Sequence, residues 1–74
     1  MPIRSFFAGR KFGARAINTM SLAFEGVCDQ LGLVKTADDP ATRLVAEKII
    51  ELAQGGIHDA DLLQAMALNE IGRD

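Results

Sequence analysis

Cys28 and His58 are the only thiol and the only imidazole in the 74-residue chain, so cysteine-based catalysis would have to use them together. A catalytic thiolate needs a base beside it, and no motif in the sequence pairs the two residues. Cys28 falls between Val27 and Leu31 in an apolar pattern, which is typical of a buried structural thiol. A lone imidazole cannot assemble a metal site, and we therefore predict that His58 is a solvated loop residue.

The serines and glycines form no recognisable catalytic or nucleotide-binding motif. Ser5 and Ser21 lack the glycine-flanked elbow that exposes a nucleophilic hydroxyl, and only the single histidine could complete a triad. Gly9 and Gly13 belong neither to a phosphate loop that ends in lysine and serine or threonine nor to a dinucleotide fingerprint. We therefore expect no enzymatic activity and no cofactor.

Asp59 and Asp61 have the spacing that opens a calcium-binding loop. The later ligand positions of such a loop are taken by Leu63, Ala65 and Ala67, which offer no side-chain oxygen. Asp59 is instead typical of a helix N-cap, and Asp61 then lies in the first turn, where the helix dipole favours negative charge. The sequence predicts a helix that begins after Asp59 and no metal site.

The first fifteen residues carry four positive charges and no acid: Arg4, Arg10, Lys11 and Arg15. The whole chain has eight basic and ten acidic residues, so the remainder has four basic and ten acidic ones and a net charge of −6. Residues 1–12 contain glycine, proline and apolar residues without a clean helical period, which predicts an extended or frayed basic arm. Such an arm could contact nucleic-acid phosphates, an anionic membrane surface or an acidic protein, or merely offset the acidic remainder.

Residues 13–31 show the first helical pattern. Gly26 inside it costs about 1 kcal/mol relative to alanine, so it either permits a close backbone approach or weakens the helix. Gly32 predicts a left-handed stop, and Leu33 would fold back onto the helix in a Schellman ending. The apolar stripe, with spacings of mostly three and four, comprises Ile17, Met20, Phe24, Val27, Cys28 and Leu31.

Two further helices are predicted over residues 40–54 and 60–71. The pair Asp39-Pro40 combines a capping carboxylate with a proline at the first helical position, where the missing N–H costs nothing. Gly55-Gly56 ends the helix over 40–54, and Gly72 follows the helix over 60–71. Both connections are short, which favours antiparallel neighbours.

The composition is that of a globular domain, with 49% hydrophobic residues and a formal net charge of −2. This balance excludes intrinsic disorder, and no apolar run approaches the roughly 20 residues of a membrane span. The sequence therefore predicts an all-α fold, with a three-helix domain over 13–74 preceded by the basic arm over 1–12.

The small size of the domain bears on its assembly. A chain of this mass buries only about 60% of its unfolded surface, and the hydrophobic gain is then similar to the conformational entropy cost. A single cysteine allows no internal disulfide. We therefore predict a homo-oligomer or a subunit of a larger assembly.

Two segments and a following dipeptide carry a resemblance to a known group. The segments are AFEGVCDQLGL over 23–33 and DPATRLVAEKIIELAQGG over 39–56, and His58-Asp59 follows them. Over residues 20–71 the chain resembles short uncharacterised helical proteins of alphaproteobacteria. The resemblance implies a bacterial, cytoplasmic setting and supplies no catalytic residues.

The functional expectation is a non-enzymatic protein-interaction module that binds through an apolar helix face. At about 1.5 Å per residue the helix over 13–31 is about 30 Å long and outruns the second at about 22 Å, so its outer end would have uncovered apolar side chains. We predict that Phe12, Ile17 and Met20 form the contact. The alternative is that the arm binds nucleic acid or an anionic surface through Arg4, Arg10, Lys11 and Arg15.

Overall fold

The computed structural model describes residue 7 and residues 12–35 and 38–72. These residues form three helices, α2 (Ala14–Leu31), α3 (Pro40–Gln54) and α4 (Ala60–Ile71), and no strand. The predicted all-α fold is confirmed, and the predicted helix bounds agree with the observed ones to within one residue. None of the described helices is long and apolar enough to cross a membrane.

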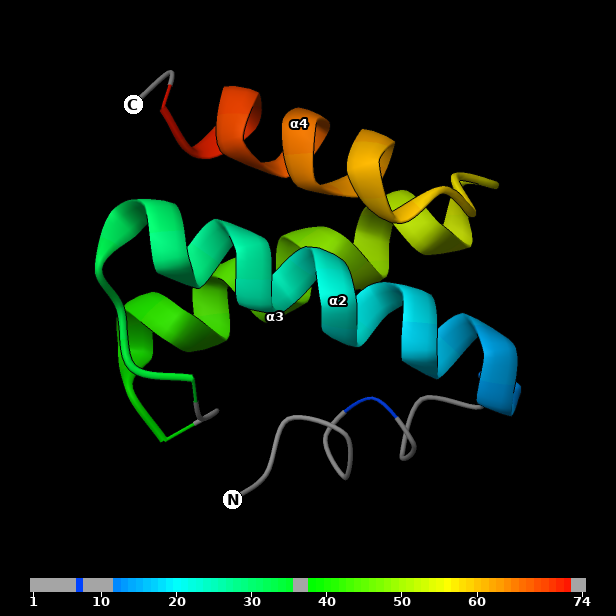
Figure 1. The fold of residues 1–74 in the computed structure, drawn as a ribbon, viewed down its shortest axis with the longest axis horizontal. Helices are drawn as coiled ribbons and strands as arrows, with labels where there is room; N and C mark the ends of the chain where they lie inside the picture. Colours follow the sequence, from blue (N-terminus) through cyan, green and yellow to red (C-terminus); the bar gives the residue numbers. More distant parts are fainter. Residues whose placement is uncertain (1–6, 8–11, 36–37, 73–74) are drawn as a thin grey trace.

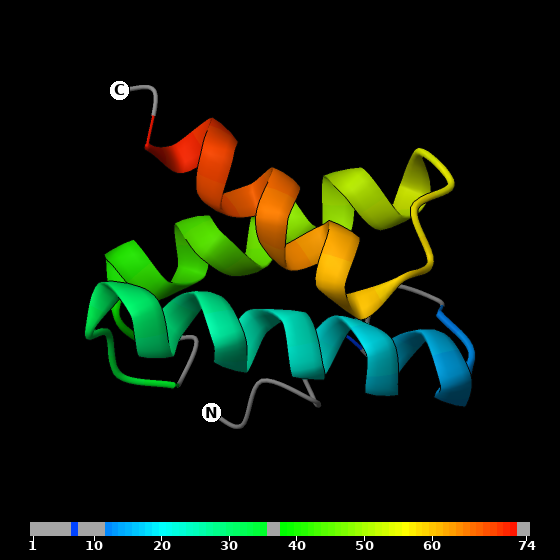
Figure 2. The same cartoon turned by 45° about the horizontal axis from the view of Figure 1, so that its top comes forward.

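The three helices pack against one another, and each helix runs antiparallel to the one before it in the chain. Figure 1 shows α2 in front of α3, with α4 lying across the top of both, and Figure 2 shows the same arrangement turned forward. Each pair of helices is in contact. The end of α2, the start of α3 and the end of α4 consequently lie at the same end of the bundle.

Both predicted aspartate caps are present. The Oδ1 atom of Asp39 accepts hydrogen bonds from the backbone N–H of Ala41 at 2.9 Å and of Thr42 at 3.3 Å. Asp59 caps α4 in the same way, with the N–H groups of Asp61 at 2.9 Å and Leu62 at 3.2 Å. Each carboxylate satisfies two amides that lack a partner inside the helix, so the two helices begin where the sequence places them.

Glycines in the left-handed region end α2 and α3. Gly32 has φ 69°, and the N–H of Leu33 donates to the carbonyl of Cys28 at 2.9 Å, which is the backbone hydrogen bond of the predicted Schellman ending. Gly56 has φ 104°, and the N–H of Ile57 donates to the carbonyl of Leu52 at 3.2 Å. A side chain at either glycine would be strained, because L residues rarely adopt these angles.

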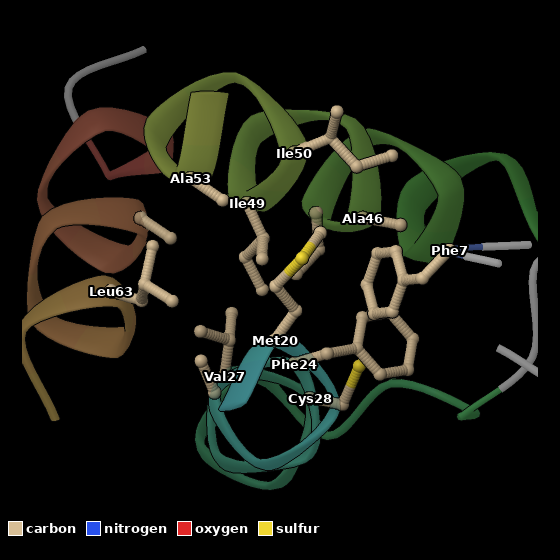
Figure 3. Packing of buried hydrophobic residues seen from close by; sticks show 13 residues of the cluster. Phe7, Met20, Phe24, Val27, Cys28, Ala46, Ile49, Ile50, Ala53 and Leu63 are labelled. Atoms are coloured by element: carbon tan, nitrogen blue, oxygen red, sulfur yellow. The ribbon is translucent and has the colours of Figure 1, made fainter. Parts of the chain in front are cut away.

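The core lies between α2 and α3 and is closed by α4 (Figure 3). Phe7 and Phe24 meet edge to face, with ring centroids 6.2 Å apart and an interplanar angle of 88°. Phe7 precedes all three helices, yet none of its side chain is exposed. The buried hydrophobic residues are Phe7, Met20, Ala23, Phe24, Val27, Cys28, Val45, Ala46, Ile49, Ile50, Ala53, Leu63 and Ala67.

Gly26 on α2 lies beside the Gln64 side chain of α4. A Cβ atom built at Gly26 would overlap the side-chain amide of Gln64 on α4. The atoms in the way belong to the flexible end of the Gln64 side chain, so the structure does not show the close backbone approach considered for this glycine.

Replacing Gly26 with alanine tests this packing. Alanine gains about 0.5–1 kcal/mol of helix propensity, but the Gln64 amide must swing away to make room. We expect Gly26→Ala to leave the free energy of unfolding almost unchanged in the native chain and to raise it by about 0.5–1 kcal/mol in a Gln64→Ala background. Urea unfolding of the four proteins measures this coupling, and equal effects in both backgrounds would contradict it.

Candidate protein-interaction surface

The structure covers part of the predicted contact surface on α2. Met20 is a core residue with 1% of its surface exposed, so the expectation that its side chain is uncovered is wrong. Phe12 and Ile17 are half-buried and pack against the core. The uncovered apolar side chains were predicted from the lengths of the first two helices alone. That comparison left out the chain before α2, where Phe7 packs in the core beside Phe24.

The basic residues are only partly placed. Arg15 lies in the first turn of α2 and is exposed to solvent. Arg4, Arg10 and Lys11 fall outside the described residues. Binding of a polyanion through these side chains therefore stays a prediction, as does a partner contact at Phe12 and Ile17.

The two residues first considered for chemistry occupy the environments predicted for them. Cys28 is a free thiol with 0% of its surface exposed. Burial raises the pKa of the Cys28 thiol, although the positive charge of Lys35 opposes the shift. His58 is exposed in the connection between α3 and α4. In the described part of the chain, no group of three or more histidine, cysteine or acidic residues could hold a metal ion.

Ser21 carries a buried hydroxyl without a hydrogen bond. The residue is 4% exposed, and its Oγ has no partner, unlike the hydroxyl of buried Thr42, which donates to the carbonyl of Val34 at 2.6 Å. Leaving such a group unpaired costs about 1–3 kcal/mol. The unpaired hydroxyl of Ser21 is therefore a cost to stability that the sequence pattern did not reveal.

The two buried hydroxyls make a matched pair of substitutions. We expect Ser21→Ala to raise the free energy of unfolding by about 1 kcal/mol, because it removes the unpaired polar atom and improves helix propensity. Thr42→Val should lower it by about 1–2 kcal/mol, because the Val34 carbonyl loses its donor. Thermal and urea unfolding measure both, and a destabilised Ser21→Ala variant would show that the hydroxyl has a partner in solution.

Helix α4 buries much less of itself than the other two helices. Helices α2 and α3 each have six buried residues, whereas α4 buries only Leu63 and Ala67. Yet eight of the twelve residues of α4 are apolar: Ala60, Leu62, Leu63, Ala65, Met66, Ala67, Leu68 and Ile71. A helix that is apolar around most of its circumference is normally covered on more than one side.

The uncovered apolar residues of α4 follow a second row beside the buried one. Leu63 and Ala67, four residues apart, face the core, while Leu62 and Met66 form the adjacent row. Leu62 is 47% exposed, and Met66 is half-buried. Ala65, next to this row, is exposed and small. Leu62 and Met66, one turn apart, thus form a short apolar strip on the outer side of α4.

An ion pair joins the row of α4 that contains Leu62, Met66 and Glu70 to a row of side chains on α3. Lys48 Nζ lies 3.0 Å from Glu70 Oε2 on α4 and 3.6 Å from Glu51 Oε2 on its own helix. The hydrogen bond to Glu70 raises the pKa of Lys48. Leu52 lies one turn after Lys48 on α3, and Met66 lies one turn before Glu70 on α4, so with the two helices running in opposite senses (Figure 1) both apolar side chains lie on the same side of the ion pair.

We call the surface made by these two rows the α3–α4 face. Leu62 and Met66 form its apolar part together with Leu52, which is half-buried and also packs against the core. The Lys48–Glu70 pair borders that part, and Leu44, 55% exposed, lies one turn beyond Lys48. The residues of the face are Leu44, Lys48 and Leu52 on α3 and Leu62, Met66 and Glu70 on α4. Their arrangement provides apolar side chains at intervals of four residues. None of these six side chains is placed as a nucleophile or as an acid–base pair.

A polar surface hollow on α3 adjoins the α3–α4 face at Glu51. It is open, measures about 240 Å³ and is lined by Glu47, Ile50, Glu51 and Gln54. Ile50 is 6% exposed, so the accessible groups are two carboxylates and an amide. The hollow adds negative charge to the outer side of α3 and little apolar surface.

The contact residues predicted from the sequence include none on α4. The pairs Leu62–Met66 and Leu63–Ala67 each have a spacing of four, but they are offset by one residue and so occupy neighbouring rows. The adjacent Leu62-Leu63 is the signal that could have revealed a second face.

Comparison of the chain with family models, curated proteins and solved structures found no match.

Proposed function

We propose that the protein is a non-enzymatic interaction module that binds another protein chain through the α3–α4 face. The observation that supports the proposal is the second apolar row of α4, in which Leu62 is 47% exposed and Met66 is half-buried. Covering a leucine side chain removes apolar area from water at about 25 cal/mol per Å². A helix laid along this face would cover several such side chains at once.

The total surface area of the chain gives no separate reason for a partner. The accessible surface is 4423 Å², close to the roughly 4,500 Å² that scaling predicts for a folded monomer of this mass. Single exposed leucines such as Leu22 on α2 and Leu31 at its end are ordinary for a protein surface. The proposal therefore rests on the grouping of apolar residues on α4 and not on a shortage of core.

Site-specific photo-crosslinking in the native host tests this function. A photoreactive amino acid at position 62 should give a discrete covalent adduct on irradiation, whereas the same amino acid at position 22, a leucine that is 62% exposed on α2, should give none. An adduct of twice the 8.0 kDa chain mass would identify a second copy as the partner, and any other mass a different protein. Equal yields at both positions, or no adduct at position 62, would contradict the proposal.

A further inference from the structure

We infer that the partner of the α3–α4 face is an amphipathic helix whose apolar side is flanked by lysine or arginine. The inference rests on the proposed function and specifies the chemistry of the partner. The apolar part of the face runs along one turn of α4 from Leu62 to Met66 and extends across to Leu52 on α3. Such a strip accepts a helix that presents anchors at intervals of three and four residues.

The shape and softness of the strip suit a helix. Leu62 and Met66 are one turn apart, so they match the one-turn spacing of anchors on a partner helix. Ala65 beside them has no bulk beyond Cβ and allows a partner backbone to approach α4. The Met66 thioether has three rotatable bonds and adapts to the shape of an apposed side chain.

The charges around the strip are predominantly negative. Asp59 and Asp61 lie at the Leu62 end, and Glu51 and Glu70 lie beside Lys48. Four carboxylates against one ammonium give a local charge of −3, and both carboxylates near Lys48 contact it. A partner with cations beside its apolar side chains would pair with this rim, and opposite charges also accelerate the encounter.

The same rim disfavours a second copy of the chain on this face. Two α3–α4 faces brought together would oppose like charges, because each carries four carboxylates and one lysine. An acidic or neutral helix would gain the apolar contact alone. The charge pattern therefore favours a basic amphipathic helix over a second copy of the chain and over an acidic or neutral helix.

Binding of synthetic helices to the full chain tests the inference. The probe is a fluorescently labelled 14-residue peptide of leucine and lysine with leucine at helical spacing, and its control has glutamate in place of every lysine. We expect the lysine peptide to bind at least tenfold more tightly than the glutamate peptide and to lose affinity as salt rises from low to moderate concentration. Equal affinity of the two peptides would overturn the inference.

Matched variants locate the binding. Leu62→Gln combined with Met66→Gln should weaken the lysine peptide at least fivefold, whereas Leu22→Gln on α2 and Glu47→Gln in the α3 hollow should leave it within twofold. Amide chemical-shift changes on the unmodified protein give a second readout that does not depend on the variants folding. Shifts confined to residues 59–70 and the α3 row support the inference, and shifts centred on Glu47 and Gln54 overturn it.

The two proposals fail in different ways. A specific adduct at position 62 together with peptides that bind without charge preference would leave the proposed function standing and remove the basic helix as partner. Absence of any adduct at position 62 would contradict the proposed function itself.

Discussion

Replacing Phe7 with alanine is expected to lower the free energy of unfolding by about 3–5 kcal/mol, a large share of the stability of a small domain. The Phe7 side chain is fully buried, and its ring packs edge to face with the ring of Phe24 at a centroid distance of 6.2 Å. Truncation removes that contact and leaves a cavity between α2 and α3, where the two helices cannot close without moving.

Urea unfolding followed by circular dichroism measures the effect, and Phe12→Ala is the control. Phe12 is half-buried, so its truncation should cost less than half as much as that of Phe7. A Phe7→Ala, Phe24→Ala double-mutant cycle should reveal a coupling of about 0.5–1.5 kcal/mol from the aromatic pair. A loss below about 1 kcal/mol for Phe7→Ala would show that the segment before α2 contributes nothing to the core in solution.

Leu63→Ala is expected to cost about 2–5 kcal/mol, whereas Leu62→Ala should change the stability by about 0.5 kcal/mol or less. The two leucines are consecutive on α4, but Leu63 is 0% exposed and Leu62 is 47% exposed. Leu63 and Ala67 are the two buried residues that attach α4 to the bundle. Leu68 and Ile71 pack against the core only in part, so losing the larger of the two fully buried side chains removes a large part of the contact of α4 with the bundle.

Denaturant unfolding of the two single variants compares their free energies of unfolding. Both variants replace leucine with alanine in the same helix, so the change in helix propensity is the same and cancels in the comparison. The pair reports directly on the two rows of α4, one in the core and one on the α3–α4 face. Similar losses for both variants would mean that Leu62 is covered in solution, either by this chain or by a second copy. Repeating the measurement at several protein concentrations distinguishes those two cases, since only association depends on concentration.

The helices themselves were predictable from the sequence because their signals are local. Asp39 and Asp59 bond amides two and three residues ahead, and Gly32 and Gly56 adopt a backbone conformation that other residues avoid. Such contacts lie within one turn of chain and need no partner helix. The buried state of Cys28 was predictable for a similar reason, since its place in the apolar stripe fixes the side of the helix it faces.

The candidate site was much less predictable. The sequence indicated an interaction through an apolar helix face, but it placed that face on the helix over 13–31 and included Met20, which lies in the core. Which apolar row is covered depends on the elements packed against it. Phe7 helps to close the core beside α2, while Leu62 remains 47% exposed.

By itself the sequence determined the all-α class, the helix limits, their caps and the acidic character of the helices, because these follow from local hydrogen bonding, backbone preference and composition. Only the tertiary structure decided that Phe7 belongs to the core, that Gly26 accommodates Gln64 and that Lys48 reaches Glu70. These contacts join residues at least 17 positions apart, and their existence depends on how whole helices are oriented. Periodicity gives the rows on each helix, and packing decides which row is left for a partner.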